Sequence, residues 1–234
     1  MKVSLVLMTW KRIPDLKETL KELSVQTHKD FEVYLSNGNL EQAAQVDKYV
    51  NQYKDKLKIR VSHDGNEHRS FRRLLAARKL AQEGTEIIMF LDDDVQIPPT
   101  YIAKCLSQYT PKSYYSGFAW TFYNQGKNYY KFRTRRWDNK HKIHYCGTGM
   151  SMLDATIFLD DRLIDDAPKG ALTIEDLWLS YFVDHVLGWE LRFMQIPDVI
   201  LEGSDSVALF EEILKQPYTK EHFLRDLVSM GWKI

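Results

Sequence analysis

The 234-residue sequence lacks an excess of either charge, because 32 Lys and Arg residues balance 32 Asp and Glu residues. A chain with zero formal net charge gives no global electrostatic reason to expect a nucleic acid or an anionic membrane surface as its partner. The sequence also lacks any apolar run near the ~18 residues of a transmembrane helix. We therefore expect neither a transmembrane segment nor a nucleic-acid partner.

Cysteine is scarce as well, since Cys105 and Cys146 are the only two in the sequence. They lie far apart without metal-site spacing, which favours two reduced, buried thiols. The start, MKVSLVLMTWKR, has a very short apolar stretch that runs into Lys11 and Arg12 without a small-residue cleavage site. It is interpreted as a first strand and not as a signal peptide. These features favour a cytoplasmic location; nothing in the sequence indicates an oligomeric state.

Segments typical of strands and helices alternate over the first hundred residues. Apolar or alternating runs predict strands at 3–8, 31–35, 58–63 and 86–91. Between them, apolar stripes predict helices over 14–23, 46–53 and 71–84. Strands that alternate with helices through short loops pair in parallel, with right-handed crossovers. The fold class expected is α/β, with a Rossmann-like, mostly parallel sheet flanked by helices.

The second half has a different character. Residues 114–137 are aromatic and β-prone, 144–153 form a strand broken by two glycines, 173–188 form a helix, and 190–197 form a last strand. Helical patterning over 205–232 is weaker. The sequence contains no repeat, low-complexity tract or linker, so we expect one domain over 1–234 with two halves, 1–99 and 100–234. The second half is expected to add a small antiparallel sheet.

Four polar loops follow the predicted parallel strands: TWKR, SNGN, HDGN and DDDV. Ligands of open α/β sheets bind beyond the carboxyl ends of the strands. The four loops are therefore expected to meet at one crevice.

Asp92, Asp93 and Asp94 end the most apolar of the predicted strands. One interpretation is a solvated acidic turn. At the end of a buried strand, however, adjacent negative charges raise the free energy unless a positive charge balances them. Mg²⁺ or Mn²⁺ takes one or two carboxylates together with diphosphate oxygens. Alternation along an extended segment puts Asp92 and Asp94 on one side and Asp93 on the other, so we expect Asp92 and Asp94 to share the metal.

Five segments together resemble the nucleotide-sugar glycosyltransferases of the GT-A fold, and among them the inverting members of the family 2 type. In chain order they are VSLVLMTWKR, SFRRLLAAR, LDDDV with its Asp-X-Asp form, YCGTGMSMLDATIF and IEDLWLSYF. One segment departs from the family pattern, because SNGN stands where such proteins usually have an acidic pair. Asn37 offers an amide there and not a carboxylate, which leaves the identity of the donor base open.

The resemblance implies a donor site for a nucleoside-diphosphate sugar, with UDP as the default, in the half 1–99. The donor-binding residues it implies are Thr9, Trp10, Arg12, Asn37, Asp64, Arg73, Asp92 and Asp93, and the metal ligands for Mn²⁺ or Mg²⁺ are Asp94 and Asp92. From the residues alone, Trp10 fits core packing equally well, and Arg73 fits an exposed helix position.

The resemblance also implies an acceptor site for a carbohydrate or glycoconjugate in the half 100–234. The acceptor-binding residues are Gly147, Thr148, Gly149 and Trp178, and the catalytic residues are Asp176 as general base and Glu175, which holds the acceptor. A base on the acceptor side favours inversion. The residues alone leave alternatives open: TIED resembles a capping box, the glycines fit a bulge, and Trp178 fits the core.

The basic aromatic segment around Arg133, Arg135 and Arg136 fits a lid over the diphosphate, a nucleic-acid patch or a solvated hairpin. Three other classes of protein compete with a glycosyltransferase. A haloacid-dehalogenase-type phosphatase also ends a strand in Asp-X-Asp, but it has Thr or Val where this chain has Gln96. A sugar-nucleotidyltransferase needs a Gly-rich loop after the first strand, and TWKRIPD contains no glycine. The third class is a catalytically inactive nucleotide-sugar-binding protein on the same scaffold.

Overall fold

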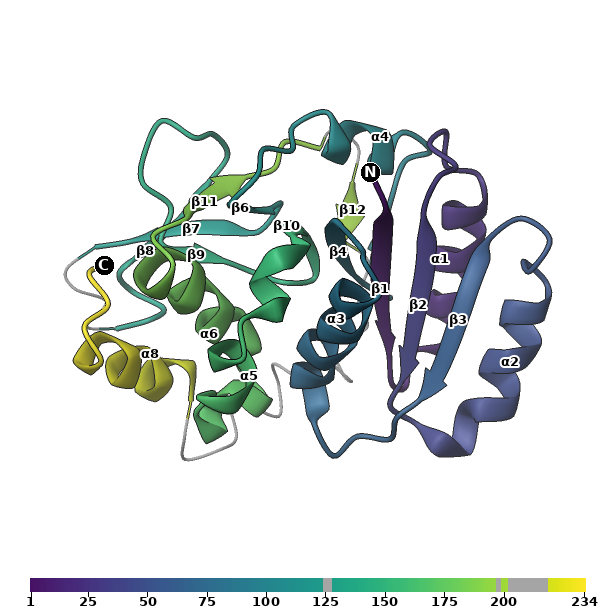
Figure 1. Cartoon of the computed structure of the whole chain (residues 1–234), viewed down its shortest axis with the longest axis horizontal. Helices are drawn as coiled ribbons and strands as arrows, with labels where there is room; N and C mark the ends of the chain where they lie inside the picture. Colours follow the sequence, from purple (N-terminus) through teal and green to yellow (C-terminus); the bar gives the residue numbers. More distant parts are fainter. Residues whose placement is uncertain (124–127, 197–198, 202–218) are drawn as a thin grey trace.

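The computed structural model describes residues 1–123, 128–196, 199–201 and 219–234. In these ranges a seven-stranded sheet has the order β11–β6–β10–β4–β1–β2–β3 (Figure 1). Its strands are β1 (Val3–Thr9), β2 (Glu32–Asn37), β3 (Lys58–His63), β4 (Ile87–Asp92), β6 (Ser113–Ser116), β10 (Met150–Asp154) and β11 (Glu190–Phe193). All pairs are parallel except those of β10, which runs antiparallel to β4 and to β6. The expected mostly parallel sheet is confirmed.

Helices and two smaller sheets complete the described ranges. The α-helices are α1 (Ile13–Ser24), α2 (Ala43–Asn51), α3 (Arg72–Gln82), α4 (Tyr101–Leu106), α5 (Arg162–Asp165), α6 (Glu175–Tyr181) and α8 (Lys220–Ser229). Short helices of other types are η1 (Leu40–Gln42), η2 (Arg69–Phe71), η4 (Ala155–Leu159), η5 (Lys169–Leu172) and the π-helical η6 (Phe182–Val186). An antiparallel sheet joins β8 (Arg133–Arg136), β7 (Ala119–Phe122) and β9 (Tyr145–Cys146), and β5 (Val95–Gln96) pairs with β12 (Ile200–Leu201). No helix within these ranges is long and apolar enough to cross a membrane.

Most residues of the central strands are buried because helices cover both faces of the sheet. Every residue of β1 is buried. Leu5 and Leu7 pack in one apolar cluster with Leu16 of α1, whereas Val6 packs in the other cluster with Leu74 of α3. Alternate side chains of one strand thus contribute to two cores, which a continuous apolar run predicts.

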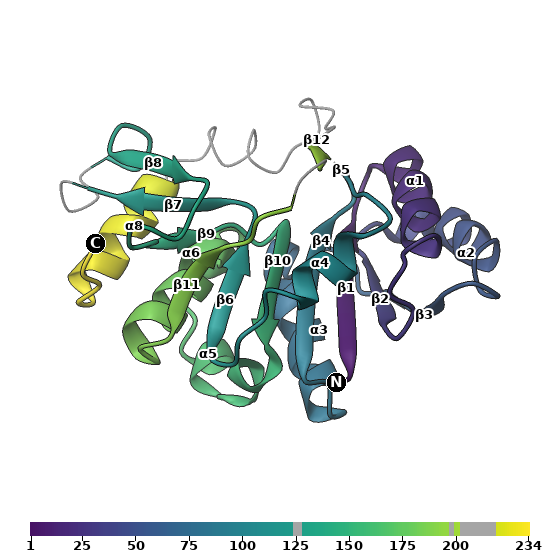
Figure 2. The same cartoon turned by 90° about the horizontal axis from the view of Figure 1, so that it is seen from above.

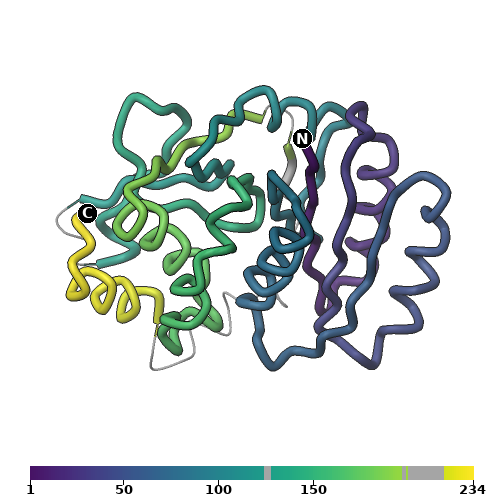
Figure 3. The backbone as a smooth tube through the Cα atoms, viewed as in Figure 1, coloured from purple at the N-terminus to yellow at the C-terminus, as the bar shows by residue number. Residues whose placement is uncertain are grey.

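The order of the strands in the large sheet determines where the candidate site lies. The chain runs outward from β1 to β2 and β3 and then returns to β4 on the other side of β1, so the strand order reverses between β1 and β4. Met8, near the end of β1, lies opposite Asp92 at the end of β4. The small sheet and α8 lie on the opposite side of the molecule from β3 and α2, as Figures 2 and 3 also show. Ligands of α/β proteins bind at such a reversal point.

Three details differ from the sequence-based expectation. Helix α4 follows Pro99, where no helix is predicted. The strand expected over 144–153 is divided at its glycines into β9 and β10, which belong to different sheets. The weak helical pattern over 205–232 yields α8 at its end, while residues 205–218 lie outside the described residues.

Candidate active site

A cavity of about 690 Å³ lies at the carboxyl ends of β1 and β4. The loops after these strands, the loop between β9 and β10, the start of α6 and residues of β7, β8 and α8 all contribute to its wall. Predicted site residues in the wall are Thr9, Trp10, Arg12, Arg73, Asp92, Asp93, Asp94, Gly147, Thr148, Gly149, Glu175 and Asp176. Residues predicted for donor and for acceptor thus share one cavity.

The acidic turn after β4 is paired with a cation from the loop after β1. Arg12 Nη1 lies 2.6 Å from Asp94 Oδ2 and 3.3 Å from Asp93 Oδ1. Burial raises the pKa of Asp93 to about 7, and burial together with the charge of Asp92 raises the pKa of Asp94 to about 6. Residues 93 and 94 form a turn, so the alternation of strand side chains ends at Asp92. Asp93 and Asp94 therefore do not point to opposite sides as expected, and both contact Arg12.

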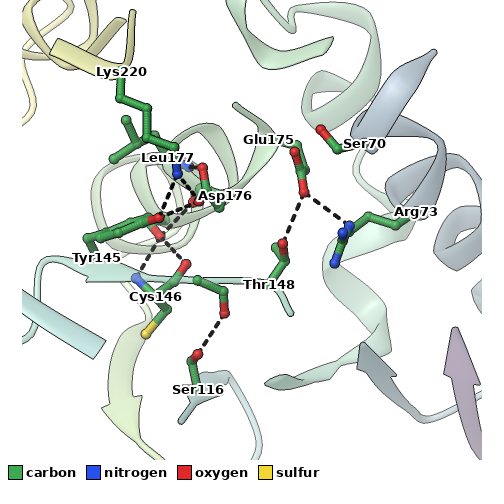
Figure 4. A network of polar contacts seen from close by, with 12 residues as sticks. Ser70, Arg73, Ser116, Tyr145, Cys146, Thr148, Glu175, Asp176, Leu177 and Lys220 are labelled. Atoms are coloured by element: carbon green, nitrogen blue, oxygen red, sulfur yellow. Dashed lines mark hydrogen bonds and ion pairs between the residues drawn. The ribbon is translucent and has the colours of Figure 1, made fainter. Parts of the chain in front are cut away.

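Arg73 connects the end of β4 to the start of α6. Its Nη2 lies 3.0 Å from Asp92 Oδ1. Its Nε lies 3.0 Å from Glu175 Oε1, as Figure 4 shows. Thr148 donates a hydrogen bond of 3.0 Å to the same Glu175 oxygen. Burial alone lowers the pKa of Arg73, but the charges of Asp92 and Glu175 outweigh burial and raise it. Burial raises the pKa of Glu175.

The chain itself therefore supplies positive charge to the aspartates. Arg12 and Arg73 are ion-paired with Asp92, Asp93 and Asp94 and so provide part of the positive charge for which the sequence indicated a metal. The acidic motif alone does not indicate these ion pairs, because Arg12 is 81 residues from Asp93 in the sequence and Arg73 is 19 residues from Asp92.

Asp176 and Glu175 point to different partners, as Figure 4 shows. Asp176 Oδ2 accepts hydrogen bonds from the Tyr145 hydroxyl and, over 2.6 Å, from Lys220 Nζ. Its Oδ1 accepts from the Leu177 N–H over 2.9 Å. Burial lowers the pKa of Lys220, but the charge of Asp176 outweighs burial and raises it. The N-cap of α6 is Ile174, which makes no side-chain cap, so Asp176 does not complete the capping box that TIED resembles.

The carboxylates of Asp92 and Asp94 fit a hard divalent cation that completes its shell with phosphate oxygens. Both side chains line the cavity, with exposed fractions of 36% and 23%. No group of three or more His, Cys, Asp or Glu side chains among the described residues is arranged to hold a metal by itself. Mg²⁺ binds through one or two carboxylates plus substrate phosphates, so this set fits a metal that binds together with a diphosphate.

Asn37 and Asp64 do not line the cavity. The Asn37 side chain is buried; its Nδ2 donates to Asn39 O over 2.8 Å, and its Oδ1 accepts from Asn39 N. Asp64 accepts hydrogen bonds from Ser36 and Ser62. Both side chains therefore hold together the loops after β2 and β3 in this structure.

Trp178 also lies away from the cavity. The side chain is 2% exposed, its Nε1–H donates to Leu163 O over 2.8 Å, and its ring stacks on Tyr181. This is the core placement that the sequence left open, and it gives no support to a role in binding the acceptor.

Sequence reasoning missed several residues of the cavity wall. Arg72 donates to the carbonyl oxygens of Thr9 and Gly65, and burial together with Arg73 lowers its pKa to about 10. The two consecutive arginines in SFRRLLAAR are the sequence feature that could have indicated Arg72. Lys220 belongs to α8 and Trp120 to β7, and no motif marks either of them.

The fold and the cavity define the GT-A class of glycosyltransferases. The family model "Glycosyl transferase family 2" matches residues 4–162, which is more than half of the sequence. The chain therefore belongs to glycosyl transferase family 2. No curated protein matches the sequence. Membership in this family leaves the phosphatase alternative without support.

Solved structures share the fold at low sequence identity. S. aureus TarS 1–349 in complex with UDP-GlcNAc is 16% identical with a TM-score of 0.59, over 98% of this chain and 71% of that one. The mannosyltransferase PcManGT from Pyrobaculum calidifontis, in complex with GDP-Man and Mn²⁺, is 14% identical with a TM-score of 0.58, over 98% and 68%. GalNAc-T7 with UDP, GalNAc and Mn²⁺ is 13% identical with a TM-score of 0.59, over 83% and 42%. The chain spans 42% of the longer TarS structure.

Proposed function

We propose that this chain transfers a sugar from a nucleoside-diphosphate sugar, with UDP as the nucleotide, to an acceptor hydroxyl with inversion. The observation that carries the proposal is a single cavity that contains both the acidic turn after β4 and the acidic pair at the start of α6. Since both halves of the sequence contribute to this cavity, we propose that residues 1–234 act as one catalytic unit.

On the donor side, Asp92 and Asp94 would hold Mn²⁺ or Mg²⁺ together with the diphosphate. When bound, the metal stabilises the negative charge of the leaving group. Arg12 and Arg73 lie beside these carboxylates and keep them positioned. Trp10 lines the cavity with Lys11 Nζ 3.8 Å above its ring, so an aromatic side chain and a cation are available in the cavity wall for the nucleotide. Complexes of TarS with UDP and with UDP-GlcNAc support the choice of uridine.

On the acceptor side, Asp176 acts as general base. The acceptor oxygen forms a bond to the anomeric carbon, its proton passes to Asp176, and the bond to the diphosphate breaks with its electron pair on the leaving oxygen. A carboxylate has about four acceptor positions, and Asp176 uses three of them for Tyr145, Lys220 and Leu177. One position is left for the acceptor hydroxyl. Glu175 contributes indirectly, because it fixes Thr148 of the acceptor loop.

The direct test is release of nucleoside diphosphate from a panel of UDP-, GDP- and other nucleotide sugars, with and without Mn²⁺. We expect Mn²⁺-dependent release from a UDP-sugar. Tight donor binding without turnover of any donor would instead favour the catalytically inactive binding protein. A rate of nucleoside diphosphate release that changes neither with Mn²⁺ nor with a chelator would contradict the proposed metal site.

Asp94→Ala is expected to weaken UDP binding in the presence of Mn²⁺ by at least about 10-fold, or about 1.4 kcal/mol, because one of two proposed metal ligands is lost. Isothermal titration with and without Mn²⁺ measures the effect. Asp47→Ala is the control, since Asp47 is an exposed residue of α2 that pairs with His63 outside the cavity. Equal metal-dependent affinity in Asp94→Ala and wild type would remove Asp94 from the proposed metal site.

Gly149→Ala is expected to weaken metal-dependent UDP binding by about 10-fold, or about 1.4 kcal/mol. A Cβ at residue 149 would lie 2.3 Å from Asp92 Oδ2, so the carboxylate must move. Gly117→Ala is the matched control, because its added methyl meets the flexible end of Met150 and not a carboxylate. If the two variants bind UDP and Mn²⁺ equally, the position of Asp92 does not matter for donor binding.

A further inference from the structure

A row of aromatic side chains lines the cavity on the side of the small sheet. Phe118 precedes β7, Trp120 belongs to β7, and Tyr145 belongs to β9. The rings of Phe118 and Trp120 are stacked with centroids 6.2 Å apart, and those of Trp120 and Tyr145 are 4.9 Å apart. Tyr145 ends the row with a hydrogen bond to Asp176. The row therefore leads from Phe118 along the cavity wall to the proposed base.

Arg135 lies over this row. It is the cross-strand partner of Trp120 in the pairing of β7 with β8, and Cζ lies 5.1 Å from the Phe118 ring centroid. Its Nη2 donates to Gly117 O over 3.2 Å, and its buried Nε has no hydrogen-bond partner in the part of the chain that the structure describes. The guanidinium therefore has donors that no protein group uses there.

Arg135 differs from Arg12 and Arg73 in its lack of a carboxylate partner, although each of those arginines also has a buried nitrogen without a hydrogen-bond partner in the described ranges. Arg72 has no ion pair among the described residues either, but it is used in hydrogen bonds to the carbonyl oxygens of Thr9 and Gly65. Arg12 and Arg73 each contact two carboxylates, whereas no ion pair joins Arg135 to a described carboxylate. Burial alone lowers the pKa of Arg135. A half-buried guanidinium without a counter-charge, in the wall of a substrate cavity, is suited to a forked contact with a carboxylate or phosphate of a ligand.

We propose that the acceptor is a carbohydrate with an anionic group, whose ring packs along Phe118 and Trp120 and whose carboxylate or phosphate binds Arg135. The acceptor hydroxyl then lies toward Tyr145 and Asp176. This inference rests on the proposed function, because it names the substrate class of the same site. The diphosphate of the donor is the other anion that could bind Arg135. The experiment below distinguishes an anionic acceptor from the donor diphosphate as the partner of Arg135.

The test uses three sugars that differ at one carbon: glucose, glucuronate and glucose 6-phosphate. Each is titrated against wild type by ligand-observed NMR, with and without UDP and Mg²⁺. We expect at least one anionic sugar to bind about 10-fold more tightly than glucose, as a charge-assisted hydrogen bond provides; the tighter of the two anions distinguishes a carboxylate from a phosphate. Arg135→Gln should reduce the preference to less than about 3-fold while UDP binding stays unchanged.

Arg136→Gln is the matched control, since Arg136 is the next residue of β8, does not line the cavity and donates to Thr121 instead. It should keep the preference for the anionic sugar. If Arg135→Gln does not fold, Arg135→Lys keeps the charge without the fork and should lower the preference. No preference in wild type, a preference that survives in Arg135→Gln, or an equal loss of UDP binding in that variant would overturn the inference. Failure of wild type to bind UDP in the arm without sugar would instead count against the proposed function.

Discussion

Asp176→Asn is expected to reduce the rate of nucleoside diphosphate release by roughly 10²–10⁴-fold, the range that general base catalysis contributes. The amide keeps the shape of the side chain but cannot take the acceptor proton. Donor binding should be unchanged, because Asp176 contacts Tyr145 and Lys220 and none of the aspartates after β4. Initial rates with a UDP-sugar that wild type turns over, together with UDP titration, measure both quantities.

The same helical segment provides a matched control for this variant. Asp184 of η6 also pairs with a lysine, Lys142, and accepts a hydrogen bond from a ring N–H, that of Trp232. Its side chain is 14% exposed, as is that of Asp176, but it lies outside the cavity. Asp184→Asn should therefore retain activity. Full activity in Asp176→Asn, or an equal loss in both variants, would show that Asp176 is not the base.

Arg73→Met is expected to lower the free energy of unfolding by about 3–5 kcal/mol, because removal of one partner leaves buried charge without compensation. Arg73 is the shared partner of Asp92 and Glu175, and Glu175 is buried. Urea unfolding followed by circular dichroism measures the difference. Addition of Glu175→Gln to Arg73→Met should recover part of the loss, since it removes the buried charge.

Arg78→Met is the control from the same helix. Arg78 pairs with Asp161 and Asp165, whose side chains are exposed, and an exposed ion pair contributes about 0–1 kcal/mol. A loss in Arg73→Met no larger than that in Arg78→Met would contradict the view that the Arg73 pairs hold β4 against α6.

The parallel half of the fold was predictable because its signals are local. The apolar run of β1, the stripe of α1 and Gly84 after α3 with its φ of +85° each act within a few residues. The convergence of the loops follows from the parallel strands, and most predicted residues do meet in one cavity. Asn37 ends β2 and Asp64 follows β3, but the Asn37 side chain accepts a hydrogen bond from Asn39 N–H and that of Asp64 accepts one from Ser36 of β2, so neither lines the cavity.

The remaining parts of the site depend on contacts between distant segments. Lys220 reaches Asp176 only because α8 packs into the core through Phe223, Leu224 and Leu227. The weak helical pattern of that segment gives no hint of the packing. The pairing of Arg12 with Asp93 and Asp94 is equally non-local, so reasoning from the acidic motif alone assigned the missing positive charge to a metal.

Strand β10 has a consequence for attempts to redesign the acceptor specificity of this protein. The loop before β10 accepts a peptide hydrogen bond from Asp92 N–H at Gly149 C=O over 2.8 Å. The Asp92 carboxylate lies so close to residue 149 that only glycine fits there without a shift. A foreign segment grafted in place of residues 147–149 must therefore bring a glycine at its third position and keep that carbonyl in place. Otherwise, a change intended for one substrate alters the site of the other.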